Sequence, residues 1–240
     1  MGFLSRQGGF VVHCVRTRDS RHHHDKPKVG PAPNPQTRME TQAMQTPPET
    51  LAAVILAGGQ GRRMGGRNKG WVEYRGRPLI EYAIERLRPQ TAQLAISSNT
   101  DIDRYRALGF PVLTDPHRDY RGPLAGIAAA FNAFPGHEIL CAPVDAPELP
   151  RDLERRLRQA LEASTAPAAI AHDGERLQPL FALLRPVLAD RLDRELARGA
   201  LAVGRWFREV GALTVDFSDQ PRAFANINTP EDLQPSPPGP

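Results

Sequence analysis

The sequence contains little cysteine and no long hydrophobic run. Cys14 and Cys141 are its only cysteines, which is too few for a disulfide framework, and neither stands in a metal-ligand spacing. No apolar run approaches the roughly 20 residues of a membrane-spanning helix, and the N-terminus lacks the apolar region of a signal peptide. These absences exclude a disulfide-stapled secreted protein, and they predict a cytoplasmic protein with reduced thiols and no membrane partner.

The body of the chain also lacks an excess of charge of one sign. The whole chain has 31 basic and 27 acidic residues, a net charge of +4, but residues 1–50 hold seven of the basic and four of the acidic residues. A body that binds a nucleic-acid duplex normally shows a larger basic excess. Aromatic residues make up only 6% of the chain and form no cluster for base stacking. We therefore predict no nucleic-acid partner; RNA binding through the basic N-terminal segment is an alternative that deletion of residues 1–45 would test.

The two ends of the chain lack the periodic apolar pattern of folded segments. Residues 1–50 contain six prolines and a run of three histidines, and the C-terminal QPSPPGP is also proline-rich. We predict a disordered N-terminal extension over residues 1–50 and a disordered tail over residues 234–240. Residues 51–233 then form a single domain, which is an ordinary size for one core.

Short apolar runs alternate with helix-patterned segments between these ends. The first run, AAVILAG, is apolar throughout, as in a parallel strand buried on both faces. We expect strands at 52–58, 93–99, 110–115, 138–145, 167–174, 178–185 and 212–217, and helices at 79–89, 101–109, 122–134, 149–163, 186–199 and 203–210. This alternation predicts an α/β fold, a Rossmann-like open, mostly parallel sheet flanked by helices. Ligands of such sheets bind beyond the C-terminal ends of the strands.

A glycine-rich basic loop follows the first predicted strand. The segment LAGGQGRRMGGRNKG (residues 56–70) holds six glycines, four basic residues and no acid. Glycines let backbone N–H groups approach an anion, and Arg62, Arg63 and Lys69 supply neutralising charge. The spacing fits neither the Walker A loop nor the dinucleotide fingerprint. The loop therefore predicts a phosphate site of another kind, and the alternative is a surface loop with solvated arginines.

Two aspartates end predicted strands. Asp115 follows FPVLT and Asp145 follows EILCAPV, so both carboxylates are expected to point into the ligand crevice. Mg²⁺ is usually held by one or two carboxylates together with phosphate oxygens and water. Beside a phosphate-binding loop, Asp145 is thus a candidate magnesium ligand. The alternative for either residue is a helix cap or a turn.

The string LAGGQGRRMGGRNK (residues 56–69) resembles the signature of the MobA-like nucleotidyltransferases, and the resemblance extends over residues 52–233. It implies a fold of the nucleotide-diphospho-sugar transferase type and Mg²⁺ as cofactor. The implied reaction transfers GMP from GTP to the terminal phosphate of molybdenum-molybdopterin and releases pyrophosphate. The implied partners are these two substrates and the proteins of molybdopterin synthesis and molybdoenzyme maturation.

The resemblance also assigns roles to individual residues. It implies that Arg63 and Lys69 steady the charge on the leaving pyrophosphate and that Asp145 holds the metal. Relatives often carry asparagine where Ser97 stands, so either Ser97 or Asn99 makes that nucleotide contact here. The residues implied to contact the nucleotide are Leu56, Ala57, Gly58, Gly59, Lys69, Ser97, Asn99, Asp115 and Asp145.

Two further segments, HDGERLQPL (172–180) and FANINTPEDL (224–233), resemble family segments near the acceptor. They imply Gln178, Asn226 and Asn228 as acceptor contacts, and the two asparagines would point the same way along an extended stretch. The alternative for the second segment is a plain helix start at TPEDL. Relatives often carry an arginine soon after the glycine matching Gly199, where this chain has Ala200, Leu201 and Ala202; Arg205 is the nearest substitute.

Other functions stay open at this point. The same site chemistry would serve cytidylyl transfer to the same cofactor or transfer to a sugar phosphate, although the wording LAGG resembles the guanylyl branch more than the LAAG of cytidylyl relatives. A non-catalytic nucleotide-binding adaptor that delivers the cofactor is a hypothesis of a different class. Asp145→Ala separates the two classes, because it should abolish turnover and leave delivery largely intact.

Overall fold

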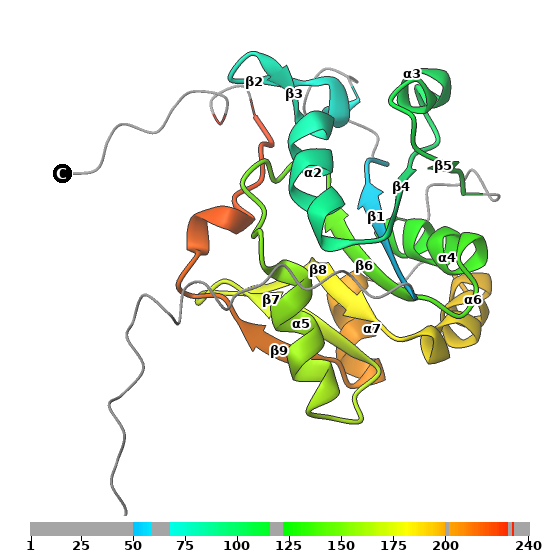
Figure 1. Ribbon diagram of the computed structural model, residues 1–240. Coiled ribbons are helices and arrows are strands. Elements are labelled where there is room, and N and C mark those ends of the chain that lie inside the picture. Colours follow the sequence, from blue (N-terminus) through cyan, green and yellow to red (C-terminus); the bar gives the residue numbers. More distant parts are fainter. Residues whose placement is uncertain (1–49, 59–67, 116–121, 200–201, 230–231, 233–240) are drawn as a thin grey trace, which may run out of the picture. The chain divides into compact units, whose positions relative to one another are not determined.

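The computed structural model describes residues 50–58, 68–115, 122–199, 202–229 and 232. They build one seven-stranded sheet in the order β5-β4-β1-β6-β8-β7-β9 (Figure 1). The predicted disordered ends, residues 1–50 and 234–240, lie outside the described residues except for Thr50. The strands of the sheet are β1 (Leu51–Leu56), β4 (Gln93–Ser97), β5 (Val112–Leu113), β6 (Glu138–Pro143), β7 (Ala168–His172), β8 (Leu177–Leu184) and β9 (Leu213–Asp216).

The sheet is mostly parallel, as predicted. β5, β4, β1 and β6 run parallel to one another, and β7 runs parallel to β9. β8 is antiparallel to both of its neighbours, β6 and β7, which the sequence pattern did not indicate. The cause is the short connection from β7 to β8 over residues 173–176, because a parallel pair needs a crossover of a dozen or more residues.

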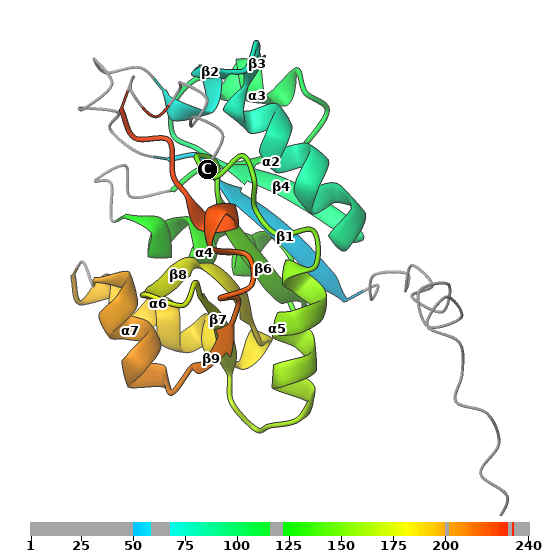
Figure 2. The ribbon, with the colours of Figure 1, turned by 90° about the vertical axis from the view of Figure 1, so that its left-hand side faces the viewer.

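Helices cover both faces of the sheet (Figures 1 and 2). α2, α3 and α5 contribute to the core on one face, and α4, α6 and α7 contribute to the core on the other. The helices are α2 (Leu79–Leu87), α3 (Ile102–Arg106), α4 (Pro123–Ala133), α5 (Leu153–Glu162), α6 (Ala189–Ala197) and α7 (Val203–Val210), with short 3-10 helices η2 (Lys69–Trp71), η3 (Arg88–Gln90), η4 (Pro186–Leu188) and η5 (Pro221–Phe224). No helix among the residues described has the length and apolar character to cross a membrane.

Strand β1 explains why the first apolar run is unbroken. Alternate side chains of a strand point to opposite faces: Leu51, Ala53 and Ile55 enter one core, and the residues between them enter the other. None of the six is more than 7% exposed. Burial on both faces, predicted from the run, is confirmed, and it fixes the position from which the glycine-rich loop departs.

The sequence pattern did not predict a small antiparallel hairpin. β2 (Glu73–Tyr74) pairs with β3 (Arg77–Pro78), and the two-residue turn between them has Arg75 at φ 49° and Gly76 at φ 77°. Positive φ at both central residues is the geometry of a type I′ hairpin turn. Each strand has only two residues, too few for an alternating pattern to show in the sequence.

Candidate active site

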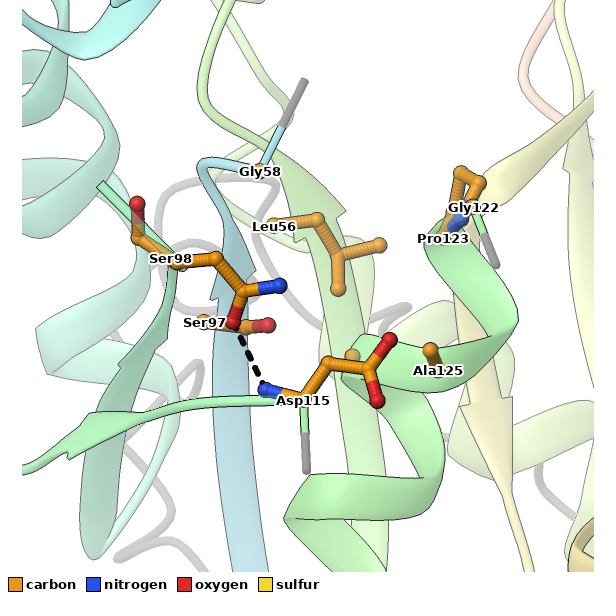
Figure 3. A pocket seen from close by; sticks show the side chains of 10 residues that line it. Leu56, Gly58, Ser97, Ser98, Asp115, Gly122, Pro123 and Ala125 are labelled. Carbon is orange, nitrogen blue, oxygen red and sulfur yellow. Dashed lines mark hydrogen bonds between the residues drawn. The ribbon is translucent and has the colours of Figure 1, made fainter. Parts of the chain in front are cut away.

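A pocket of about 410 Å³ opens at the C-terminal ends of β1 and β4, beside the N-terminus of α4 (Figure 3). This is the crevice in which the fold class predicts a ligand. Five of the candidate residues line it: Leu56 and Gly58 at the end of β1, and Ser97, Asn99 and Asp115 at the ends of β4 and β5. The lining residues are Leu56, Gly58, Ser97, Ser98, Asn99, Asp115, Gly122, Pro123, Ala125 and Gly126.

One wall of the pocket is held together by the side chain of Asn99. Its Oδ1 accepts a hydrogen bond from the backbone N–H of Asp115 at 2.8 Å (Figure 3). β5 is only two residues long and pairs with β4 only as far as Leu113, so this contact extends the alignment of the two segments past the end of the strand. Asp115 is 9% exposed, and its carboxylate is directed toward the α4 side of the pocket (Figure 3).

The floor of the pocket depends on a close approach between α4 and the sheet. A Cβ atom at Gly126 would lie 2.6 Å from Oγ of Ser97 and 2.8 Å from Cδ2 of Leu56. Both distances are far below van der Waals contact, so only glycine lets the helix pack at this depth. Gly122 at φ 77° precedes Pro123, which starts the helix in the position where proline is favoured.

A second cluster joins three residues that are distant in sequence. Nζ of Lys69 lies 2.6 Å from Oδ2 of Asp145 and 2.6 Å from Oδ1 of Asn228. Lys69 begins η2, and Asp145 follows β6. The segment carrying Asn228 is tied to Asp145 by a hydrogen bond from the backbone N–H of Ile227 to the carbonyl oxygen of Asp145, at 2.8 Å. The structure thus unites a predicted phosphate ligand, a predicted metal ligand and a predicted acceptor contact.

The second carboxylate oxygen of Asp145 is left without a partner in the described part of the chain. Oδ1 is buried and makes no hydrogen bond within the described part of the chain, which is a costly state for a carboxylate oxygen. In that same part, no group of three or more His, Cys, Asp or Glu side chains could hold a metal ion. A single carboxylate fits Mg²⁺, which takes its other ligands from substrate phosphates and water.

Gln178, by contrast, is engaged in the turn between β7 and β8. Its Nε2 donates to Oδ2 of Asp173 at 2.6 Å, and Oδ1 of Asp173 accepts from the backbone N–H groups of Glu175 and Arg176. Burial alone would raise the pKa of Asp173, but these hydrogen bonds hold it below its usual value. The carboxylate therefore fixes the orientation of the Gln178 amide.

The two upstream asparagines occupy different surroundings. Asn228 contacts Lys69, whereas Oδ1 of Asn226 is buried and has no hydrogen-bond partner among the residues described. Arg205, the substitute considered for the missing arginine, lies on α7 and pairs with Glu209 at 2.6 Å. Gly59, Arg63 and the start of the segment after Gly199 lie outside the described residues, so their predicted roles stay predictions.

Sequence reasoning missed the residues that support Lys69. The side chain of Asn68 contacts Gly70, Tyr105 and Thr100. The only signal in the sequence was an asparagine directly before the lysine, at the end of a glycine-rich loop. Tyr105 carried no signal, because it lies 37 residues further along the chain in a helix with an ordinary pattern.

Comparison with known proteins adds an independent finding. Residues 53–212 match the model of the MobA-like NTP transferase domain. The chain is 45% identical to the molybdenum cofactor guanylyltransferase of Shewanella sp. (strain ANA-3) over 184 residues, covering 77% of this chain and 93% of the relative. The corresponding protein of Shewanella loihica is 43% identical, with coverage of 77% and 94%.

A solved structure is similar as well. The crystal structure of molybdopterin-guanine dinucleotide biosynthesis protein A from Archaeoglobus fulgidus superimposes with a TM-score of 0.64 at 25% identity, covering 76% of this chain and 94% of that one. The similarity to this protein therefore extends from the amino-acid sequence to the fold that carries the pocket.

Proposed function

The chain belongs to the MobA-like NTP transferase family, and from this premise we propose how its site works. Its reaction is the guanylyl transfer that forms molybdopterin guanine dinucleotide. We propose GTP and molybdenum-molybdopterin as the two substrates and Mg²⁺ as the cofactor. The observation that carries the proposal is the contact between Lys69 and Asp145 at 2.6 Å beside an unpartnered carboxylate oxygen.

The pocket suits the guanosine part of GTP. Leu56 and Gly58 line it, and the glycine-rich loop that starts there leads to Lys69. Guanine presents N–H donors on one edge, and the nearly buried carboxylate of Asp115 is an acceptor at the pocket wall. Ser97, only 8% exposed, is short enough to lie under α4, and Asn99 holds Asp115 in place. In this arrangement the triphosphate extends toward Lys69.

The transfer itself needs no protein nucleophile. An oxygen of the terminal phosphate of molybdopterin attacks the α-phosphorus of GTP, forming a P–O bond. The bond from the α-phosphorus to its bridging oxygen breaks, and pyrophosphate leaves with that electron pair. The ammonium of Lys69, together with Arg63, neutralises the charge that grows on the leaving group, and this kind of preorganised charge is usually the largest catalytic contribution.

Asp145 would hold the magnesium ion through its unpartnered Oδ1. When bound, Mg²⁺ supplies Lewis-acid chemistry by neutralising phosphate oxygens and polarising the phosphoryl group. Asp145 also holds Lys69 through Oδ2, so it orients the cation that faces the phosphates. Asn228, whose Oδ1 accepts from Lys69, would bind the acceptor phosphate with Asn226 and Gln178.

The proposal also covers the location of the protein, the extent of its catalytic domain and its protein partners. We propose a cytoplasmic location, on the grounds of the two-cysteine composition. We propose residues 51–233 as the single catalytic domain. Proteins of molybdopterin synthesis and molybdoenzyme maturation are the proposed protein partners, because they would supply the acceptor and receive the product.

The test is pyrophosphate release with Mg²⁺ and molybdenum-loaded molybdopterin, comparing GTP, CTP and ATP. We expect release with GTP alone, and Asp145→Asn should lower the rate by about a thousandfold. The matched control is Asp103→Asn, because the Asp103 side chain is 97% exposed on α3; its rate should equal that of the wild type. A preference for CTP would contradict the choice of base. GTP binding without release would favour the adaptor hypothesis.

A further inference from the structure

Asn68 uses its whole side-chain amide to hold the turn that carries Lys69. Oδ1 accepts from the backbone N–H of Gly70 at 3.1 Å and from the hydroxyl of Tyr105 at 2.7 Å. Nδ2 donates to Oγ1 of Thr100 at 3.0 Å. The contact with Gly70 caps η2. The side chain of Asn68 thereby fixes the backbone on both sides of Lys69.

Gly70 makes the contact with Tyr105 possible. A Cβ atom at Gly70 would lie 2.2 Å from the Tyr105 hydroxyl oxygen, so any larger residue would displace the ring. Gly70 itself is buried. The absence of a side chain at Gly70 therefore leaves room for the Tyr105 hydroxyl to reach Asn68.

Tyr105 is a rigid anchor. It is fully buried, and its ring stacks on Trp71 with the centroids 4.9 Å apart and the planes at 29°. The guanidinium of Arg104 lies 3.8 Å from the centroid of the Trp71 ring, a favourable cation–π position. Burial raises the pKa of Tyr105, although the hydrogen bond to Asn68 lowers it in part, so the hydroxyl keeps its proton and donates.

Two of the three partners of Asn68 belong to the segment that follows β4. Thr100 comes directly after Ser97, Ser98 and Asn99, which line the pocket, and Tyr105 follows in α3. Ser98 is tied to this segment too, because its Oγ donates to the carbonyl oxygen of Thr100 at 2.9 Å. The turn of Lys69 and the wall of the pocket are thus attached to the same short stretch of chain.

We propose that Asn68 and Tyr105 are positioning residues that set where the Lys69 ammonium lies relative to the nucleoside pocket. They hold the backbone on both sides of Lys69 at a fixed place, which lets its side chain meet the phosphates of a nucleotide already seated in the pocket. Their effect is therefore specific to the triphosphate. This inference rests on the proposed function, in which the pocket takes guanosine and Lys69 takes phosphate.

The test compares the dissociation constants of GTP and guanosine by calorimetry. Tyr105→Phe removes one hydroxyl and keeps the buried ring and its stacking. We expect GTP to bind about 10-fold more weakly to this variant, as for the loss of one well-placed hydrogen bond, and guanosine to bind within twofold of the wild type. Merely structural damage would weaken both ligands alike.

Two further variants separate positioning from stability. Tyr82→Phe is the matched control, since it removes a hydroxyl that donates to the carbonyl oxygen of Tyr74 at 2.9 Å; binding of both ligands should be unchanged. Asn68→Asp keeps an acceptor for Gly70 and Tyr105, and it should bind GTP better than Asn68→Leu. In the Lys69→Met background, Tyr105→Phe should have no further effect on GTP.

Each result decides between the two proposals. If the wild type binds GTP and Tyr105→Phe binds it equally well, Tyr105 does not position Lys69 and the inference is overturned. An equal loss for GTP and guanosine, or an undiminished effect in the Lys69→Met background, overturns it as well. If the wild type binds neither ligand, the proposed function fails and the inference fails with it.

Discussion

The Nζ atom of Lys69 and Oδ2 of Asp145 lie 2.6 Å apart, although 76 residues separate them in the sequence. Both side chains are only partly exposed, 28% for the lysine and 13% for the aspartate. An ion pair in such a place is weakly screened by solvent. In the proposed mechanism, the triphosphate and the magnesium ion would share these two side chains, the phosphates contacting the lysine and the metal contacting the aspartate.

Replacing the lysine measures its share of the catalysis. Lys69→Met should lower kcat/KM for GTP by about a hundredfold to a thousandfold, because it removes a charge aimed at the leaving group. Lys69→Arg keeps the charge but changes its geometry, and it should fall between the methionine variant and the wild type. Pyrophosphate release at limiting GTP gives both numbers. A methionine variant within threefold of the wild type would remove Lys69 from the mechanism.

The packing of α4 can be tested at Gly126. Gly126→Ala should lower the free energy of unfolding by about 1–3 kcal/mol, because the added Cβ meets Ser97 and Leu56, and it should weaken GTP binding at the pocket. Gly204→Ala on α7 is the control, since nothing lies within 4 Å of a Cβ there. It should stabilise the protein by about 0.5–1 kcal/mol through helix propensity. Urea unfolding tests both, and two effects of the same sign would refute this account.

The hydrogen bonds in the turn between β7 and β8 predict that the free energy of unfolding depends on pH. Hydrogen bonds keep the pKa of Asp173 below its usual value of 3.8, so the unfolded chain binds the proton more readily than the folded one. The stabilisation is therefore complete well above pH 3.8 and is lost as the pH falls through the lower, folded-state pKa. Urea unfolding of the wild type and of Asp173→Asn from pH 6 downward should show a difference that shrinks below about pH 4. A constant difference would contradict this explanation.

The thiol of Cys141 should be unreactive in the folded protein. It is completely buried beneath α4 and α7, in the core on that face, and burial raises the pKa of the Cys141 thiol to about 12. The thiolate, which is the reactive form, is then scarce at neutral pH. In a Cys14→Ser background, iodoacetamide should label Cys141 only in concentrated urea, as mass spectrometry can measure. Rapid labelling under native conditions would contradict the buried position.

Local sequence predicted those parts of the fold that depend on neighbouring residues. The run at β1 showed burial on both faces, and the glycines after it marked the loop. The strands before Asp115 and Asp145 followed from the same reasoning, although they end earlier than predicted, at Leu113 and Pro143. The direction of β8 was not predicted, although the short connection from β7 over residues 173–176 leaves no room for a parallel crossover.

The contacts of the site could be predicted only in part. Asp145 and Lys69 were expected at one edge of the sheet, yet their direct pairing depends on how η2 and the turn after β6 meet in space. The same holds for Asn228, which lies 159 residues from Lys69. Gln178 was expected as a free contact, and only the structure shows that Asp173 already orients its amide.

The double burial of β1 also bears on the mutational tolerance of the protein. Every side chain from Leu51 to Leu56 belongs to a core, so a substitution there changes packing before it changes chemistry. The segment after β4 is different, since Asn99 is half-buried and Thr100 is exposed. A library designed to alter the choice of nucleotide would therefore sample Asn99 and leave strand β1 untouched, because a substitution at a half-buried position disturbs the packing of the core less than one in a buried strand.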